Sequence, residues 1–386
     1  MARETLDIQS SILIWARERR GYDIETAAAK LGLSTARLVD LESGRDMPTA
    51  PKLRDLADEY RVSPAVFFLE EVPEQGFIAP NDFRRLSDGE ERTFSPSLRE
   101  AIDRVRAQMH YLHELADMGV IDARSIDFEL KVSEPVEKAA KRIRGWLAGD
   151  THTVPARRDA KKLLGEWITL IESKGILISQ VSGIPINEMR GFCLPNPSFP
   201  MIVLNGGDSD APRLFTLAHE LAHLLLGEDS ICNDPVSPNS HEVFCNAVAA
   251  AVLIPRFELL GLPQVTVATA DHPWTLDELA ELASRFGVSR EAILRRLATL
   301  GKASDRHYNA IRLELGKHYA NRPKREQGGS GPRDAVIIRN LGATYVRSVL
   351  EARNRGLLSD SSVADFFFEK IRWIDPMADR LGLSRP

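Results

Sequence analysis

The sequence predicts a mainly helical α+β protein, and three observations support this fold class. Apolar residues recur at helical spacing through most of the chain. Residues 175–204 instead hold three short runs rich in β-branched residues, bounded by Gly, Pro and Asn, which indicate a small sheet. The length of 386 residues and the 43% hydrophobic content favour more than one folded domain.

Residues 1–70 are expected to form a bundle of five short helices that contains a helix-turn-helix. The predicted helices cover residues 11–20, 24–31, 35–43, 51–60 and 64–69. Asp23 and Ser34 are suited to cap the second and third helices at their N-termini, and Gly32 and Gly44 to end them. The short turn between these two helices is typical of a helix-turn-helix.

The rest of the chain is predicted as a helical connector at 71–130, a domain with the small sheet at 131–303, and a helical C-terminal region at 304–386. Its helices are expected at residues 98–118, 134–147, 156–174, 212–226, 242–253, 276–286, 290–300, 334–355 and 361–372. Its strands are expected at residues 175–181, 190–194 and 200–204, and a Gly-rich hinge at 327–332. Residues 275–300 repeat the helix–Gly-x-Ser–helix pattern of residues 24–43, which fits a second DNA-binding unit or, more simply, a tight corner.

Composition excludes several classes of protein. The longest clean apolar run covers only residues 247–254, well short of the roughly 18 residues of a membrane helix, and no secretory pattern opens the sequence. Its three cysteines form no CxxC pair, which fits a reducing cytoplasm and disfavours a disulfide scaffold. With 50 basic and 55 acidic residues the net charge is −5, so bulk charge cannot drive nucleic-acid binding. We expect a cytoplasmic protein without a membrane partner.

An HExxH sequence at residues 219–223 is the most specific signal in the chain. Residues four apart share one face of a helix, so His219 and His223 can bind the same metal ion. Glu220 lies about 100° further round the helix, where it can reach a water at the metal but not easily bind the metal itself. The neighbouring positions are apolar and indicate a buried helix, in which these polar side chains would be costly without a metal partner.

A catalytic zinc usually takes three protein ligands and keeps one position for water, so a third ligand is expected nearby. We predict Glu242, at the start of a helix that follows His223 after a short loop, with His241 and Asp234 as the alternatives. Cys245, one turn beyond Glu242, is interpreted as a buried core residue and not as a ligand of a resting state.

The same motif predicts a hydrolytic mechanism. One bound Zn²⁺ would lower the pKa of a water and polarise a substrate carbonyl. Glu220 would take the proton of the water and pass it to the departing amine. An extended peptide could align along an edge strand, for which residues 200–204 are the candidate. The candidates for stabilising the oxyanion, by residue type alone, are His307, Tyr308, His318 and Tyr319.

The third helix of the N-terminal bundle is expected to enter the major groove of double-stranded DNA. The candidate contacts are Thr35, Ala36, Arg37 and Asp40 for base edges, and Arg45 and Lys52 for phosphates. Residues 1–70 hold 10 basic and 12 acidic side chains, and this helix has no Asn or Gln to pair with adenine. Docking of a protein partner is therefore the alternative to DNA binding.

These motifs resemble two known families. Residues 10–69 resemble Xre/Cro-type helix-turn-helix domains through the turn Gly32-Leu33-Ser34 and the helix exit Leu41-Glu42-Ser43-Gly44. Residues 175–255 resemble the ImmA/IrrE family of zinc metallopeptidases. The matching features are Arg190-Gly191-Phe192, the PMIVLN run at 200–205, the FTLAHELAHLLLG segment at 215–227, and Glu242 four residues before Asn246 in a helix ending at Pro255. Asp82-Phe83-Arg84 in the connector is also similar to proteins that fuse the two domains.

The resemblance implies a zincin-like, gluzincin-type endopeptidase with His219, His223 and Glu242 as zinc ligands and Glu220 as the catalytic acid/base. It implies a repressor or toxin-like regulatory protein as substrate, and so control of phage, mobile-element, stress or toxin–antitoxin genes. The alternative is an Xre-type regulator or antitoxin whose metallopeptidase-like domain senses a ligand or binds a partner. Xre-type modules commonly pair on palindromic sites, so a homodimer is also expected.

Overall fold

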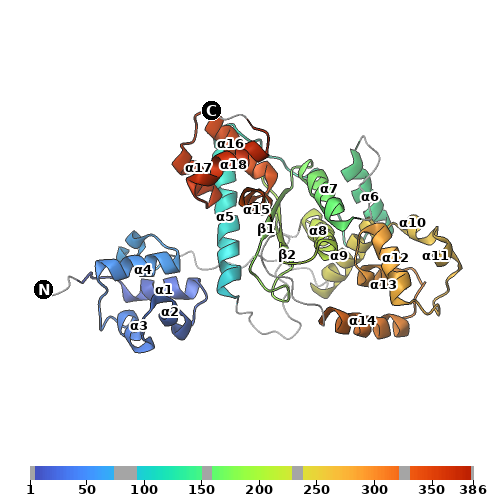
Figure 1. Ribbon diagram of the computed structural model, residues 1–386, viewed down its shortest axis with the longest axis horizontal. Helices are drawn as coiled ribbons and strands as arrows, with labels where there is room; N and C mark the ends of the chain where they lie inside the picture. Colours follow the sequence, from blue (N-terminus) through green and yellow to red (C-terminus); the bar gives the residue numbers. More distant parts are fainter. Residues whose placement is uncertain (1–4, 74–93, 150–158, 228–237, 321–330, 384–386) are drawn as a thin grey trace. The chain divides into compact units, whose positions relative to one another are not determined.

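The computed structural model describes residues 5–73, 94–149, 159–227, 238–320 and 331–383, which divide into two compact units, residues 1–107 and 108–386 (Figure 1). The described chain is mainly helical with one small sheet, so the predicted fold class is confirmed. Among these residues no helix is both long enough and apolar enough to cross a membrane. The Asp82-Phe83-Arg84 motif and most of the predicted hinge at 327–332 lie outside them.

The first unit contains the predicted five-helix bundle. Its elements are α1 (Ser10–Arg19), α2 (Ile24–Leu31), α3 (Thr35–Glu42), α4 (Ala50–Tyr60) and the 3-10 helix η1 (Pro64–Phe68). Asp23 accepts a hydrogen bond from the N–H of Thr26 at 2.7 Å, and Ser34 accepts one from the N–H of Arg37 at 3.3 Å. Gly32 ends α2 in the left-handed conformation, with φ at 63°. These local signals produce the helix-turn-helix that the sequence predicts.

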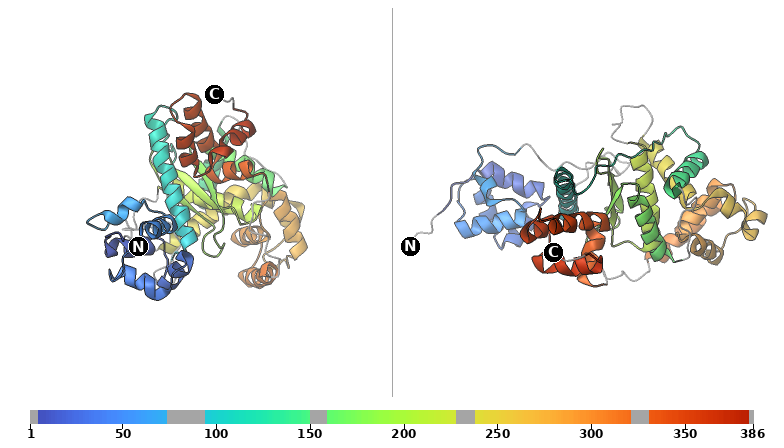
Figure 2. Two further views of the ribbon diagram at one scale, coloured as in Figure 1. Left: turned by 60° about the vertical axis from the view of Figure 1, so that its left-hand side comes forward. Right: turned by 90° about the horizontal axis from the view of Figure 1, so that it is seen from above.

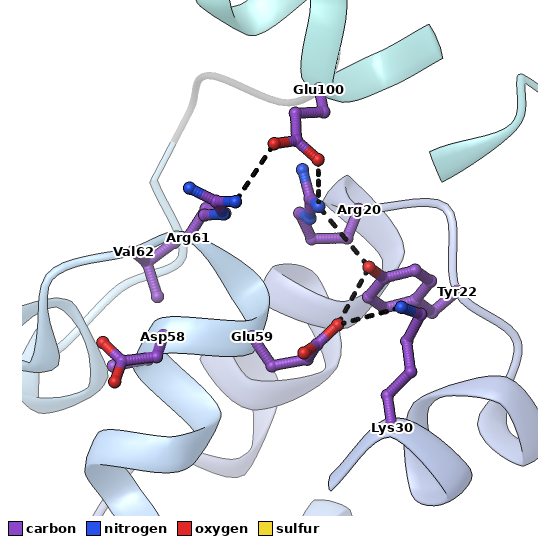
Figure 3. Close-up of a pocket in the computed structure, with 9 residues that line it drawn as sticks. Arg20, Tyr22, Lys30, Asp58, Glu59, Arg61, Val62 and Glu100 are labelled. Atoms are coloured by element: carbon purple, nitrogen blue, oxygen red, sulfur yellow. Dashed lines mark hydrogen bonds and ion pairs between the residues drawn. The ribbon is translucent and has the colours of Figure 1, made fainter. Parts of the chain in front are cut away.

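A further helix, α5 (Pro96–Asp117), begins in this unit, and charged side chains connect its first turns to the bundle. Glu100 of α5 accepts a hydrogen bond from Arg20 and pairs with Arg61, both at 3.1 Å, in a polar pocket of about 550 Å³ (Figure 3). In the same pocket the Tyr22 hydroxyl donates to Glu59 at 3.0 Å. Arg20 is only 4% exposed, so these partners offset the cost of burying its guanidinium.

The second unit is built around α8 and a three-stranded sheet. In the described part of this unit, the helices that follow α5 and precede residue 321 are α6 (Val136–Ala148), α7 (Ala160–Glu172), α8 (Asp210–Leu225), α9 (Pro238–Leu253), α10 (Arg256–Leu260), α11 (Pro263–Val267), α12 (Leu276–Phe286), α13 (Arg290–Thr299) and α14 (Asp305–Ala320). The prediction located six of them to within a few residues. It missed the five-residue helices α10 and α11, and it gave no bounds for α14.

The strands are β1 (Leu177–Val181), β2 (Gly191–Leu194) and β3 (Met201–Asn205), in the order β1-β3-β2. β3 pairs with β1 in parallel and with β2 antiparallel. The expectation that residues 200–204 form an edge strand is therefore wrong, because β3 is the central strand. Every residue of β3 is buried, and its first four residues form the unbroken apolar run that is typical of a strand covered on both faces.

Helices cover both faces of this sheet. Figures 1 and 2 show the sheet between α8 on one face and α15 (Arg333–Leu341) on the other. The helices after α15 are α16 (Ala343–Asn354), α17 (Asp360–Phe367), the 3-10 helix η3 (Ile371–Trp373) and α18 (Ile374–Arg380). Ser179 of β1 donates a hydrogen bond to the carbonyl of Asn340 at 2.8 Å, so the C-terminal helices pack onto the sheet.

The single helix expected at residues 334–355 is two helices, because the chain breaks at Gly342. This glycine has φ at 89°, and a side chain on it would collide with the carbonyl oxygen of Ile178 in β1. Only glycine tolerates both the left-handed backbone and the close approach. The predicted helix at 361–372 is likewise interrupted, since α17 ends at Phe367.

Glu172, at the end of α7, lies close to Gly342 and Ile178. Its carboxyl group is expected to make the stability of the protein depend on pH. Burial raises the pKa of its carboxyl group to about 7, against which hydrogen bonds from Thr344 and Ile178 act only in part. The folded chain therefore holds this proton more tightly than the unfolded chain does. Stability should fall as the pH rises from about 4.5 to about 7, by a contribution of about 3 kcal/mol.

Glu172→Gln should remove that contribution and be more stable than the unsubstituted chain above pH 7. Urea unfolding of both proteins at pH 5 and pH 8 measures the effect. A pH dependence that is the same in both would contradict the assignment.

Candidate metal centre

The helix α8 places the HExxH residues in the interior of the second unit. Every residue from Thr216 to Leu225 is buried, because α8 packs against the sheet on one side and α9 on another. His219 is 3% exposed, His223 is 2% exposed and Glu220 is 6% exposed. Three polar side chains are thus held in a largely apolar helix, as the sequence indicated.

His219, His223 and Glu242 converge on one point. The Nε2 atoms of the two histidines are 3.0 Å apart. Oε2 of Glu242 lies 3.6 Å from Nε2 of His219, and Oε1 of Glu242 lies 3.5 Å from Nε2 of His223. Ligand atoms on a tetrahedral ion with bonds of about 2.0–2.1 Å are separated by about 3.3 Å. The spacing and the two-histidine, one-carboxylate donor set therefore fit a single Zn²⁺.

Glu242 comes from the first turns of α9, which packs directly on α8. Among the described residues, the metal-type side chains that cluster are these three, and His241 is not one of them. Asp234, the other alternative, lies outside the described residues. Cys245 is fully buried in the hydrophobic core of the unit, in keeping with its interpretation as a core residue. The structure thus brings the predicted ligand set together, and its metal-binding role stays a prediction.

The start of β2 lies against Glu220. A Cβ atom on Gly191 would lie 3.4 Å from Cγ of Glu220 and would collide with Thr216, so this strand approaches α8 as only glycine permits. The N–H of Asn205 donates to the carbonyl of Arg190 at 2.8 Å. Arg190 and Asn205 thus form a hydrogen-bonded pair. Hydrogen-bonded and non-hydrogen-bonded pairs alternate along an antiparallel ladder, so the next pair, Gly191 and Leu204, is not hydrogen-bonded. The main-chain N–H and C=O of Gly191 therefore point away from β3.

This contact corrects the expected substrate strand. Within the described sheet, β2 and not residues 200–204 forms the edge that borders Glu220. In the sequence, Gly191 stands out only as part of the Arg190-Gly191-Phe192 match to the metallopeptidase family. The available signal was a glycine at the start of a strand, which marks a close approach.

Among the oxyanion candidates, His307 and Tyr308 have described side chains, and both contact groups other than the clustered metal-type side chains. Nε2 of His307 is 3.3 Å from the carbonyl oxygen of Trp274, and Tyr308 packs against the hydrophobic core. The side chains of His318 and Tyr319 lie outside the described part of the chain.

The helix-turn-helix presents part of the predicted DNA-contacting set. Thr35, Ala36 and Arg37 are exposed along α3. Arg37 is paired with Asp46 at 3.4 Å, but both side chains are well exposed and such a pair is weak. These three residues are therefore accessible to a DNA groove.

The other three candidates are engaged within the bundle. Asp40 is paired with Arg45 at 2.8 Å, an exposed pair that a phosphate could displace. Lys52 donates to the carbonyl oxygen of Leu31 at 3.1 Å and pairs with Asp55 at 3.0 Å. Its ammonium group thus caps the end of α2, a role that competes with the predicted phosphate contact.

The repeated pattern at residues 275–300 forms a corner. Gly287 joins α12 to α13 in the left-handed conformation, as Gly32 does in the first unit. Arg296 of α13 is 1% exposed, donates to the carbonyl oxygen of Ile254 and pairs with Glu137 at 2.8 Å. A helix so embedded in the core favours the tight corner over a second DNA-binding unit.

Two parts of the chain match protein-family models. Residues 13–67 match a helix-turn-helix family, and residues 175–298 match the IrrE N-terminal-like domain of the M78 peptidases. The matches follow the predicted order along the chain, which confirms the expected fusion of the two domains. A search of the curated proteins finds no match to this chain.

Proposed function

We propose that this chain, which joins a DNA-binding helix-turn-helix domain to a metallopeptidase-like domain, is a zinc-dependent endopeptidase of the gluzincin type acting on a regulatory protein. The observation that carries the proposal is the convergence of His219, His223 and Glu242, whose ligand atoms all lie within 4.8 Å of one another. Two imidazoles and a carboxylate are the ligand set of several catalytic zinc sites.

The residues around this point have distinct chemical roles. A zinc ion held there would polarise the scissile carbonyl and acidify a water molecule. Glu220, buried beside His219, would accept the proton of that water and deliver it to the departing amine. Burial keeps bulk water from competing for these groups and strengthens the electrostatic interactions among them.

The substrate is proposed to bind as an extended peptide along β2. The main-chain groups of Gly191 point away from β3, and the same residue lies against Glu220. A peptide paired with this edge would receive main-chain hydrogen bonds, with specificity from its side chains. Its backbone would run beside Gly191, the residue that lies against Glu220.

A repressor or toxin-like partner is the proposed substrate because the peptidase domain is joined to a DNA-binding domain. Such a domain would bring the peptidase to the sites that repressors occupy, whereas general peptide degradation needs no such domain. Cleavage would control phage, mobile-element, stress or toxin–antitoxin genes.

Incubation of the zinc-loaded full chain with each repressor encoded beside its gene tests this function. Mass spectrometry should find one defined cut in at least one repressor, and the cut should disappear after chelation of the metal. Absence of cleavage in every repressor and under every activating condition would contradict the proposal.

A second candidate function is a transcriptional regulator or antitoxin that uses the metal domain for sensing or partner binding. It is favoured by the helix-turn-helix match and by the exposure of residues 35–37 on α3. In this form two chains are proposed to pair on a palindromic operator.

Arg37→Ala should weaken binding to the chain's own operator by about 5- to 150-fold, because a base-contacting arginine contributes about 1–3 kcal/mol. Arg54→Ala, which removes an exposed arginine of α4 outside the predicted contacts, is the matched control and should bind nearly as well. Fluorescence anisotropy with a labelled operator measures both. Equal binding by the two variants would contradict the predicted role of Arg37.

A further inference from the structure

Asn205, the last residue of β3, is a buried polar residue that the proposed mechanism leaves unexplained. It has no exposed surface. Its side-chain nitrogen donates hydrogen bonds to the carbonyl oxygens of Ile184 at 2.9 Å and Met189 at 2.8 Å, and its side-chain oxygen accepts one from the N–H of Gly207 at 2.9 Å. Both donor hydrogens of the carboxamide are therefore used, as burial of an amide requires.

The two carbonyl oxygens belong to one stretch of chain, the connection between β1 and β2 at residues 182–190. Ile184 lies near its beginning and Met189 near its end. The main-chain N–H of Asn205 holds a third point, the carbonyl of Arg190, at 2.8 Å. One residue of the central strand thus fixes the path of the connection up to the residue before β2.

That path ends at the metal centre. Gly191 follows Arg190 directly and lies against Thr216 and Glu220 of α8. A Cβ atom on Gly191 would lie 2.5 Å from Cγ2 of Thr216, so the backbone at the start of β2 runs very close to α8. A movement of the connection would therefore shift the start of β2 relative to Glu220. The hydrogen bonds of Asn205 therefore hold the stretch of chain that leads directly into the contact between Gly191 and Glu220.

We propose that Asn205 is a positioning residue for the substrate peptide, acting through the β1–β2 connection to hold the edge of β2 beside Glu220. The inference rests on the proposed function, since it requires a peptide to bind along β2. It assigns to Asn205 no contact with the metal or the reacting atoms.

Two inhibitors test this role without relying on turnover. Acetohydroxamate would engage only the metal, whereas a tripeptide hydroxamate would add main-chain contacts with β2. Calorimetry on the zinc-loaded full chain should show that Asn205→Ala weakens the tripeptide hydroxamate about tenfold or more, because small displacements of aligned groups have large effects. Acetohydroxamate affinity and zinc content should stay unchanged.

Gln108→Ala is the matched control, since Gln108 is also a buried amide that donates to a main-chain carbonyl, that of Leu341, at 2.6 Å. It should keep the preference for the peptide. Hydrogen exchange in residues 182–194 should accelerate in Asn205→Ala and not in the control.

Gly207→Ala is a milder second variant in case Asn205→Ala does not fold. A Cβ atom on Gly207 would lie 3.1 Å from the side-chain oxygen of Asn205 and displace the carboxamide slightly. It should weaken the tripeptide hydroxamate in the same direction and by a smaller factor.

The outcomes separate the two proposals. If the unsubstituted chain binds the tripeptide hydroxamate no better than acetohydroxamate, peptide binding along β2 fails, and the inference fails with it. If the unsubstituted chain prefers the peptide and the folded variants at positions 205 and 207 keep that preference, the inference alone is overturned. If Gln108→Ala lost as much affinity for the tripeptide hydroxamate as Asn205→Ala, the inference would also be overturned. General loosening of the fold would then be enough to explain the weaker peptide binding.

Discussion

Glu220→Gln should abolish peptide-bond cleavage by the zinc-loaded chain while zinc stays bound. The amide has nearly the shape of the carboxylate but cannot accept the proton of a water, so the chemical step loses its base. General acid–base catalysis contributes about 100- to 10,000-fold to a reaction rate. The kcat/KM for the cleaved repressor should therefore fall by about 100-fold or more. Because the side chain is buried and the replacement is almost isosteric, we expect the fold to be retained.

Glu172→Gln is the matched control for this experiment. It makes the same chemical change at a partly buried glutamate of the same unit, which hydrogen-bonds to Thr344 in the C-terminal helices. It should keep the activity of the unsubstituted chain at neutral pH. Cleavage by Glu220→Gln at the rate of this control would remove Glu220 from the mechanism.

His223→Ala should eliminate zinc binding, the second large effect. A ligand that binds only the folded chain at about 1,000 times its dissociation constant stabilises it by about 4 kcal/mol. In domains of about 150–250 residues, each kcal/mol of added stability raises the melting temperature by about 2–4 °C. Zinc should therefore raise the melting temperature of the unsubstituted chain by about 8–16 °C. The variant should show no such rise.

His272→Ala is the control for loss of an imidazole. His272 is paired with Glu278 at 3.1 Å, in the segment before α12, and is not one of the clustered metal-type side chains. Its variant should respond to zinc as the unsubstituted chain does. Zinc stabilisation that persists in His223→Ala would place the metal elsewhere.

Features set by local sequence were predicted well. Asp23, Ser34 and Gly32 bound the helices of the helix-turn-helix because capping depends on residues within one turn. His219 and His223 share a face of α8 because helical spacing alone puts them there. The approach of Glu242 was also anticipated, from the need for a third ligand and the small number of residues between His223 and Glu242 in the sequence.

Features set by contacts distant in sequence were not predicted. The central position of β3 depends on its pairing with both β1 and β2, which an apolar run does not specify. The break at Gly342 follows from its approach to Ile178, more than 160 residues earlier in the chain. Lys52 was assigned to a phosphate by charge, yet it caps α2 because its stem places the ammonium beside the carbonyl of Leu31.

Metal analysis of the purified full chain tests the central claim most directly. Elemental analysis after zinc loading and dialysis should find one zinc per chain, and X-ray absorption should show two imidazoles and oxygen ligands around it. The same material carrying His219→Ala should contain none. A zinc-free chain after loading, or a bound zinc without imidazole ligands, would contradict the account.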